Sequence, residues 1–356
     1  MQRVLGVSFD HMHMGDLLRE VSEHPDAEIA GVFDPDPTRM ASAIETFSIP
    51  PERVFSDLGE MLSAAPADLA ILGSAPSQHA SHVDTLAKAD LNVMVEKPFA
   101  ANVGDARRMI EAMNESAGRL AINWPLAWYP PHITAKRLLD AGEIGDLIEV
   151  HHYGGNRGPL YHLADKVEVT DEEVARRKPD AWWYKQAAGG GSLLDYLGYG
   201  ATLGTWFMDG EAPLEVTCVV DDPPGLEVDE HSIAICRYAR GLSKMETRWG
   251  TFTDPWTHQT QPKCGFTLVG SAGTIASYDY EDHVTIQTRS NLEAISLPVD
   301  TLPEGRRGPV EYMLARIEDG APIEGPLDPE ICLTAQRIVD SAVLSAEERR
   351  TVSLVS

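Results

Sequence analysis

The sequence predicts an α/β protein in which a doubly wound parallel sheet is followed by an α+β domain with a mostly antiparallel sheet. The first third of the 356 residues alternates short, nearly continuous apolar runs with helical patterns. Such runs are typical of parallel strands that helices cover on both faces. Between about Pro213 and Pro298 the β-type runs follow one another across polar or glycine-bearing turns, which favours an antiparallel sheet.

Five apolar runs are the predicted strands of the first sheet, because each ends in small or polar residues where a strand would pass into a loop. A chain of this length corresponds to about two domains at roughly 150 residues each. We place the boundary after the fifth run, so the predicted domains are residues 1–123 and 124–356. The five runs are Arg3–Ser8, Ala27–Phe33, Leu69–Leu72, Asn92–Val95 and Leu120–Ile122.

The second domain is predicted to hold one strand before a long aromatic- and charge-rich segment, and a series of strands after it. The segment runs from Gly154 to Ala188, and three glycines then open an apolar helix. The predicted helices are His132–Ala141, Ser192 to about Trp206, Gly308–Ile317 and Pro329–Ala346. The predicted strands are Asp146–His152, Leu214–Val220, Ser232–Tyr238, Ser243–Thr251, Gly265–Val269, Thr274–Tyr278 and Val284–Thr288.

The net charge of the chain is −26, from 29 basic and 55 acidic residues. This balance argues against partners that bind through phosphate neutralisation, such as nucleic acids, and against anionic membrane surfaces. The acidic residues are spread along the sequence, so we interpret them as a solvated acidic surface. Adaptation to high salt would fit the same composition.

The sequence also indicates a cytoplasmic protein with no membrane partner. No stretch reaches the ~18 apolar residues of a membrane span, and Met1–Ser8 is typical of a strand rather than a signal peptide. Four widely spaced cysteines lack any Cys-x-x-Cys pairing, so neither a zinc site nor a disulfide framework is predicted. They fit a reducing compartment.

The first strand–helix turn carries a weakened dinucleotide fingerprint. In a doubly wound domain this turn receives a pyrophosphate and usually has the pattern Gly-x-Gly-x-x-Gly. Here Gly6 matches the first glycine, whereas Ser8 and His11 stand at the other two positions. Phe9 and Met12 complete the predicted contact surface of the turn.

Asp34, at the end of the second predicted strand, strengthens the prediction of a dinucleotide site. It follows the turn by about 20 residues, where a carboxylate accepts hydrogen bonds from the ribose hydroxyls. A carboxylate there repels a 2′-phosphate, so the sequence favours NAD over NADP. The alternative is that Asp34 and Asp36 only cap the next helix.

His11 and His13 suggest a second hypothesis, because a His-x-His pair after a first strand binds metal in amidohydrolase barrels. That fold needs eight strand–helix units and further ligands at later strand ends. The β-rich second half does not supply them. We therefore predict no metal site, and expect the two histidines to pack in the loop or contact the cofactor.

A set of motifs in a fixed order covers nearly the whole chain. The motifs are Ser74-Ala75-Pro76-Ser77-Gln78-His79, Glu96-Lys97-Pro98, Asn123, Gly142-Glu143-Ile144-Gly145, Gly189-Gly190-Gly191-Ser192-Leu193-Leu194-Asp195 and Gly270-Ser271-Ala272-Gly273-Thr274. With these motifs the sequence resembles the Gfo/Idh/MocA family of nicotinamide-dependent oxidoreductases. The resemblance implies a Rossmann domain followed by a domain with a large open sheet, through which such proteins form homodimers or homotetramers.

The resemblance also implies where NAD would be held. The predicted contacts lie in the first turn and at the ends of later strands. They are Gly6, Ser8, Phe9, His11, Met12, Asp34, Ser74, Ala75, Pro76, His79, Glu96, Lys97 and Asn123.

Lys97, Asp195 and Tyr199 are the predicted catalytic residues. The resemblance implies that Lys97 lies at the nicotinamide, where it contacts the reacting hydroxyl or carbonyl. Asp195 and Tyr199 are four residues apart, so they share one face of a helix. Tyr199 stands where the family usually has a histidine, as in the branch that resembles glucose–fructose oxidoreductase and dihydrodiol dehydrogenase. The alternative interpretation of Tyr199 is an aromatic side chain of the hydrophobic core. Tyr196 is expected to point to another face of the helix.

A carbohydrate-like substrate is suggested by the aromatic and polar residues near these positions. Aromatic rings can cover the apolar faces of a sugar while polar side chains bind its hydroxyls. The predicted substrate contacts are Lys97, Trp124, Arg157, Trp183, Asp195 and Tyr199.

We therefore predict an NAD-dependent oxidoreductase that acts on a secondary hydroxyl or ketone of a sugar, glycoside or polyol. One alternative is a glycoside-cleaving enzyme that retains NAD and acts through transient oxidation at C3. The other is a non-catalytic nucleotide-binding regulatory protein, because the first turn lacks two of its glycines.

Overall fold

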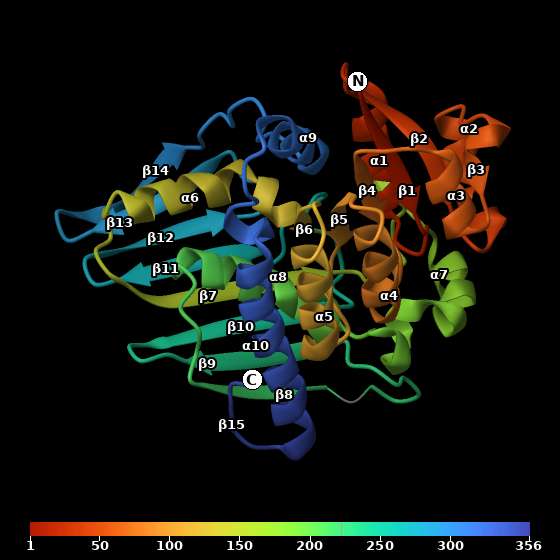
Figure 1. Cartoon of the computed structure of the whole chain (residues 1–356). Helices are drawn as coiled ribbons and strands as arrows, with labels where there is room; N and C mark the ends of the chain where they lie inside the picture. Colours follow the sequence, from red (N-terminus) through yellow and green to blue (C-terminus); the bar gives the residue numbers. More distant parts are fainter. Residues whose placement is uncertain (222) are drawn as a thin grey trace.

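The first sheet is parallel, and its strands lie in the order β3-β2-β1-β4-β5-β6. The computed structural model of the chain describes residues 1–221 and 223–356. Within them the chain builds this six-stranded sheet and a second sheet of nine strands (Figure 1). The strands of the first sheet are β1 (Gln2–Val7), β2 (Ala27–Phe33), β3 (Val54–Phe55), β4 (Leu69–Leu72), β5 (Asn92–Glu96) and β6 (Leu120–Asn123).

Helices cover this sheet on both faces, as the nearly continuous burial of its strands requires. α1 packs on β1, β2 and β4, while α4 packs on β4 and β5 and against α5. The predicted doubly wound Rossmann-like sheet is therefore confirmed. The helices are α1 (His13–Glu23), α2 (Ala41–Thr46), α3 (Leu58–Ala64), α4 (Pro76–Ala87) and α5 (Val103–Asn114).

The second sheet is mostly antiparallel, as predicted, and only the described pair β7 and β10 runs parallel. Its order is β14-β13-β12-β11-β7-β10-β9-β8-β15. The strands are β7 (Leu147–Asn156), β8 (Glu215–Val220), β9 (His231–Arg237), β10 (Leu242–Trp249), β11 (Gly265–Gly270), β12 (Gly273–Tyr278), β13 (His283–Thr288), β14 (Asn291–Pro298) and β15 (Val352–Ser353).

One face of the second sheet carries helices, and the other exposes apolar side chains. α6 (Pro130–Asp140) packs on β12 and β13, α8 (Ser192–Phe207) on β7 and β10, and α10 (Pro329–Glu348) on β8. Side chains alternate between the two faces of a strand, so β8 and β9 bury Cys218 and Ala234 but expose Val219 and Ile235.

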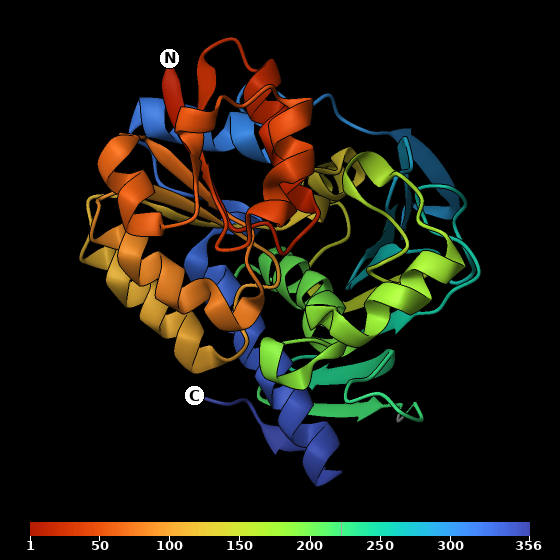
Figure 2. The same ribbon diagram turned by 90° about the vertical axis from the view of Figure 1, so that its right-hand side faces the viewer.

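The long segment before α8 lies beside the first domain (Figure 2) and also packs against Trp249 at the end of β10. It contains α7 (Asp171–Arg177) and short 3-10 turns at Ala164–Lys166, Lys178–Asp180, Trp182–Tyr184 and Gln186–Ala188. Arg19 on α1 pairs with Asp165, and the backbone N–H of Asp165 donates to Asp16 at 2.6 Å. The segment therefore closes over the N-terminal end of α1.

The two C-terminal helices return to the first domain. α9 (Pro309–Asp319) packs against α1, and α10 packs against α5. The backbone N–H of Val103 donates to Asp340 at 2.8 Å, and the side chain of Gln2 donates to the carbonyl of Leu314 at 3.0 Å. The first domain is thus completed by residues from the end of the chain.

Three short or exposed strands were not predicted. β3 has two residues, too few to show a period, and β15 is equally short. β14 is exposed along nearly its whole length, so it lacks the apolar alternation by which a strand is recognised.

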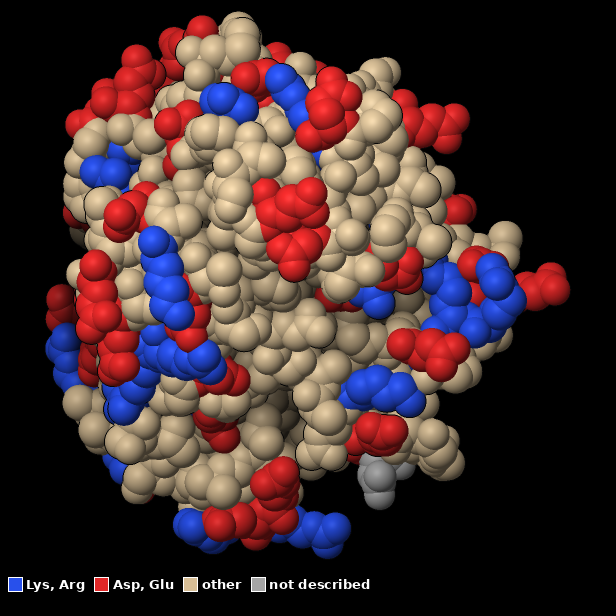
Figure 3. Space-filling view, turned by 45° about the vertical axis from the view of Figure 1, so that its right-hand side comes forward, with Lys and Arg blue, Asp and Glu red and all other residues tan. Residues whose placement is uncertain are grey.

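Surface charge and cysteine burial agree with the composition. Acidic side chains are spread over the face shown in Figure 3, many of them beside a basic side chain. Cys218, Cys236, Cys264 and Cys332 are free and buried. Across the described residues, no helix has both the length and the apolarity needed to cross a membrane.

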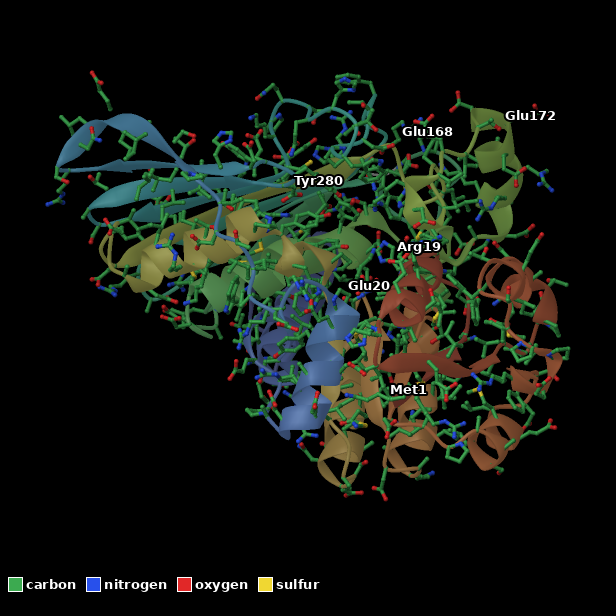
Figure 4. The ribbon with its side chains drawn as sticks, turned by 90° about the horizontal axis from the view of Figure 1, so that it is seen from above. Met1, Arg19, Glu20, Glu168, Glu172 and Tyr280 are labelled. Carbon is green, nitrogen blue, oxygen red and sulfur yellow. The ribbon has the colours of Figure 1, made fainter. Side chains whose placement is uncertain are left out.

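Glu20 makes stability depend on pH. It lies between α1 and α9, where it accepts the backbone N–H of Val310 at 3.2 Å (Figure 4). Burial raises the pKa of Glu20 from 4.5 to about 7. The folded chain therefore binds a proton more tightly than the unfolded chain, and stability falls as pH rises from about 4.5 through about 7.

We expect Glu20→Gln to raise the free energy of unfolding by on the order of 2 kcal/mol at about pH 8 and to change it little at about pH 4. The amide oxygen can still accept from Val310 but cannot ionise. Denaturant unfolding at the two pH values measures the difference. Glu23→Gln, at an exposed position on the same helix, is the control. An equal effect of Glu20→Gln at both pH values would contradict the argument.

Candidate active site

The turn after β1 begins two residues later than the sequence predicted. Gly6 lies inside β1, and the residue in the left-handed region is Ser8, with φ 63°. Ser8 therefore stands at the first glycine position of the fingerprint, Asp10 at the second and His13 at the third. The predicted register, anchored on Gly6, was wrong because the one available glycine belongs to the strand.

Side chains at these positions tie the turn to its neighbours. The carboxylate of Asp10 accepts the hydroxyl of Ser8 and the backbone N–H of Ala75, both at 3.2 Å, and pairs with Arg39. Asp34 is fully buried and accepts the backbone N–H of Phe9 at 2.7 Å. The ends of β1, β2 and β4 are therefore held together at the carboxyl edge of the sheet.

The loop after β4 supplies further predicted residues of this edge. Ser74 and Ala75 form the turn, and Pro76 begins α4. His79 is buried, with its ring nitrogens 2.9 Å from the carbonyl oxygens of Ser74 and Phe99. His79 therefore holds two loops together instead of presenting a free ring to a cofactor.

Lys97 and Asp195 meet across the domain boundary. Lys97 follows β5, and Asp195 lies in the first turn of α8. The Nζ of Lys97 is 2.7 Å from Oδ1 of Asp195, and the two side chains are 5% and 1% exposed. This short buried contact fixes both side chains in position. The structure brings together the two residues that the motifs predicted.

The start of α8 is shaped to bring Asp195 to this position. Gly191 precedes the helix with φ 109°, a conformation that favours glycine. The carboxylate of Asp229 accepts the backbone N–H of Leu193 at 2.9 Å, which satisfies one of the free donors at the helix start.

Tyr199 and Tyr196 both face Lys97. Their ring centroids lie 5.6 Å and 5.8 Å from Nζ of Lys97. The expectation that Tyr196 points to another face was wrong, because residues three apart in a helix are neighbours on its surface. Burial raises the pKa of both tyrosines well above the ordinary value, so both phenols are protonated. The hydroxyl of Tyr196 accepts the amide of Asn156 at 2.9 Å.

These groups line a cavity between the two domains. Its volume is about 60 Å³, and its wall includes Lys97, Asp195, Tyr196 and Tyr199. His11, Met12 and Trp183, all predicted site residues, also line it. Lining residues that the sequence did not single out include His152, Asn156 and Tyr280, which lies where the second sheet meets the site (Figure 4).

His152 has unusual surroundings. It is 1% exposed, and neither ring nitrogen has a hydrogen-bond partner among the described residues. Burial lowers its pKa to about 3, so the ring is neutral. No spacing in the sequence marked it, because it comes from the middle of β7.

Two predicted substrate contacts lie elsewhere. Trp124 is 2% exposed and packs against Tyr199 with ring centroids 5.1 Å apart, so it supports the site from within the core. Arg157 is bound to Asp254 at 2.8 Å and to Glu168 at 3.0 Å. These ion pairs engage its guanidinium outside the cavity.

His13 and Glu96 also meet at this edge. The Nδ1 of His13 is 2.7 Å from Oε1 of Glu96, and the amide of Asn123 donates to Oε2 of Glu96 at 2.8 Å. These two hydrogen bonds join the ends of β5 and β6 to the turn after β1. Burial lowers the pKa of the neighbouring His11 well below 6.5, so the ring of His11 is neutral.

Two family models match consecutive parts of the chain. Residues 4–124 match the model described as an oxidoreductase family with an NAD-binding Rossmann fold, and residues 132–276 match the GFO/IDH/MocA C-terminal domain. The chain belongs to the GFO/IDH/MocA oxidoreductase family. The resemblance seen in the motifs is confirmed, and so is the prediction of an NAD-binding Rossmann domain.

Curated relatives in the family align over part of their length. D-apiose dehydrogenase from Paraburkholderia graminis is 33% identical over 119 residues, which cover 33% of this chain and 31% of the relative. Inositol 2-dehydrogenase from Salmonella typhimurium is 26% identical over 146 residues, which cover 40% of this chain and 43% of the relative. The chain thus spans less than half the length of these relatives.

Two solved structures share the whole fold of the chain. Aldose-aldose oxidoreductase from Caulobacter crescentus, complexed with glycerol, has a TM-score of 0.79 at 18% identity, covering 99% of this chain and 100% of that chain. The WlbA dehydrogenase from Bordetella pertussis, in complex with NADH and UDP-GlcNAcA, has a TM-score of 0.75 at 17% identity and 99% coverage of both chains.

The first turn of this family member fits a dinucleotide at its helix end. α1 begins at His13, and its first N–H groups bond within the turn: His13 donates to Nδ1 of His11 at 3.3 Å, and Met14 and Gly15 donate to the carbonyl oxygens of His11 and Met12. The positive end of the helix dipole favours a phosphate at this position. Asp34 lies at the end of β2, next to this turn, where a ribose would be bound.

Proposed function

We propose that the protein is an NAD-dependent oxidoreductase that acts on a secondary hydroxyl or ketone of a sugar, glycoside or polyol. The buried pair of Lys97 and Asp195, 2.7 Å apart on the wall of the interdomain cavity, carries this proposal. Oxidation of an alcohol requires removal of its hydroxyl proton, and a fixed amine at the reacting carbon provides for this. The curated relatives named above act, by their names, on a sugar and a polyol.

NAD would supply the hydride acceptor. The N-terminus of α1 would hold its phosphates, and Asp34 would hold a ribose. Ser74, Glu96 and Asn123, which lie at the ends of neighbouring strands, would contact the rest of the cofactor. Lys97 accepts the proton from the substrate hydroxyl during oxidation and returns it during reduction. Asp195 positions the Nζ of Lys97, and the protonated phenol of Tyr199 donates a hydrogen bond to the substrate oxygen.

The cavity supports a polyhydroxylated substrate through its lining. Trp183 and Tyr280 offer aromatic faces, and His152 and Asn156 offer hydrogen-bonding groups. A volume of about 60 Å³ holds only a few atoms, whereas ligand sites measure roughly 300–1,000 Å³. Substrate entry therefore requires lining groups to move apart. The cover that we propose to move is the part of the aromatic- and charge-rich segment that follows β7, residues 157–188.

Activity assays with a substrate panel test the function directly. NAD and NADP reduction is followed with sugars, sugar acids, polyols and glycosides, at low and high salt. The proposal expects NADH to form with at least one carbohydrate and little or no NADPH. NAD binding without turnover on any of these classes would refute the proposed reaction, and failure to bind NAD would refute the cofactor.

Tyr199→Phe is expected to lower turnover about 10- to 100-fold, because it removes the phenolic proton and leaves the ring in place. Tyr196→Phe is the matched comparison on the same helix, and we expect a smaller loss because that hydroxyl is already bound to Asn156. Steady-state rates with the best substrate of the panel measure both. A larger loss in Tyr196→Phe would reverse the assignment.

We further propose that two or four copies associate through the uncovered face of the second sheet. Val219, Ile233 and Ile235 are 69%, 36% and 44% exposed there. An apolar sheet face of this kind is typical of an interaction surface. The boundary after Asn123 and the cytoplasmic location also stay proposals, the latter supported by the four free cysteines.

A further inference from the structure

His11, His13 and Glu96 form a cluster beside the cavity, and the proposed reaction does not use the two imidazoles. One ligand atom from each residue lies within 4.8 Å of the other two. The histidines come from the turn after β1 and the start of α1, with ring centroids 4.4 Å apart, and Glu96 is the last residue of β5. Two imidazoles and a carboxylate are a donor set that proteins use for divalent transition metals.

The surroundings of His11 point independently to a missing ligand. Its ring is 2% exposed, and Nε2 has no hydrogen-bond partner among the described residues. Buried polar atoms in proteins are nearly always paired. The rings of Trp182 and Trp183 pack against it, at centroid distances of 6.2 Å and 5.5 Å. A metal ion would give Nε2 the partner that it lacks.

Metal binding through Nε2 places the ring proton of His11 on Nδ1. The long contact of 3.3 Å, in which the backbone N–H of His13 donates to Nδ1, is then given up. This is a small loss, because hydrogen bonds weaken at such distances.

His13 and Glu96 need only a small adjustment. Their closest atoms are 2.7 Å apart, which is the distance of a shared proton. Two ligands of a tetrahedral ion with bonds of about 2.0–2.1 Å lie ~3.3 Å from each other, so the two groups must separate by roughly 0.6 Å when a metal replaces the proton. Asn123 holds the second oxygen of Glu96 at 2.8 Å and so orients the carboxylate.

We propose that His11, His13 and Glu96 bind one divalent transition-metal ion, such as Zn²⁺, with an open position toward the cavity beside Lys97. Both histidines line the same cavity as Lys97, whose charge is offset by Asp195. The open position takes an oxygen ligand. Only the identity of this ligand, a substrate hydroxyl or carbonyl, rests on the proposed function.

Zinc uptake by the full chain tests the site without substrate or NAD. The protein is treated with a chelator, dialysed against Zn²⁺ and analysed for bound metal, and Co²⁺ replaces Zn²⁺ for absorption spectroscopy. We expect one equivalent of Zn²⁺ and a visible Co²⁺ spectrum with nitrogen and oxygen ligands. His13→Ala and Glu96→Gln should lower the affinity at least about 10-fold.

The controls separate a metal site from a hydrogen-bond network. Glu96→Gln can still bond to His13 and Asn123, so its fold should persist while the anionic ligand is lost. His151→Ala removes an exposed histidine whose Nε2 lies 2.9 Å from Oε2 of Glu149. This variant should leave zinc uptake unchanged. Folded wild-type protein that retains no zinc, or variants that retain as much as wild type, would overturn the site. Because NAD and substrate are absent, neither result bears on the proposed oxidoreductase activity.

Discussion

Lys97→Met should lower turnover about 1,000-fold while NAD binding persists. The substitution keeps the length and apolar stem of the side chain but removes the amine that exchanges a proton with the substrate. A general acid or base typically raises the rate of an enzymatic reaction about 10²- to 10⁴-fold. Lys97 is the basic side chain that Asp195 holds in position on the wall of the cavity. Turnover is measured with the best substrate of the panel, and NAD binding by calorimetry.

Loss of the lysine also leaves Asp195 buried without its partner, which can destabilise the fold. The double variant Lys97→Met/Asp195→Asn removes both charges and should be folded yet equally inactive. Lys136→Met is the control, because this lysine pairs with Asp140 and Asp209 away from the cavity. Turnover of Lys97→Met within 10-fold of the wild type would refute the role of the amine.

Gly198→Ala should destabilise the protein by about 2 kcal/mol, because a Cβ at this position would lie 2.3 Å from Cη2 of Trp124. Trp124 is 2% exposed, so its ring is enclosed by other side chains and cannot move away from the added methyl group without disturbing them. Alanine favours a helix over glycine by about 1 kcal/mol, so the expected loss is what remains after this gain. Denaturant unfolding measures the change.

Gly204→Ala on the same helix is the matched control. Its Cβ would lie 3.3 Å from Cε of Met245, the flexible end of a side chain, so helix propensity should make it neutral or slightly stabilising. Trp124→Phe in the Gly198→Ala background should restore part of the loss, because the smaller ring leaves space for the methyl group. Equal stabilities of the two alanine variants would show that the contact is not tight.

The strand pattern and the order of motifs were enough to predict the fold. Strands such as Ala27–Phe33 and Leu69–Leu72 match the prediction residue by residue. Leu69–Leu72 is an unbroken apolar run that is buried throughout, and Ala27–Phe33 is buried over its last four residues. The pair of Lys97 and Asp195 was also predictable, since each lies in a motif at the end of a strand or the start of a helix.

What the sequence could not predict depends on contacts between distant residues. Gly6 was placed in the turn because composition does not reveal which residue adopts a positive φ, and that residue is Ser8. Trp124 and Arg157 have side chains suited to a sugar site, yet tertiary packing places one in the core and the other in ion pairs. The site residue His152 carries no local signal at all.

The C-terminal helices restrict how the active site can open. α9 and α10 pack on α1 and α5, so the chain crosses between the domains more than once, and a hinge-like rotation would have to break these contacts. The part of the cover that follows β7, residues 157–188, is instead held to α1 through Asp165, which pairs with Arg19 and donates its backbone N–H to Asp16. Further ion pairs join Arg157 to Asp254 and Lys178 to Glu230. Substrate exchange should therefore be a local movement of one segment over a rigid pair of domains, and its rate should depend on ionic strength because ion pairs contribute to holding the segment.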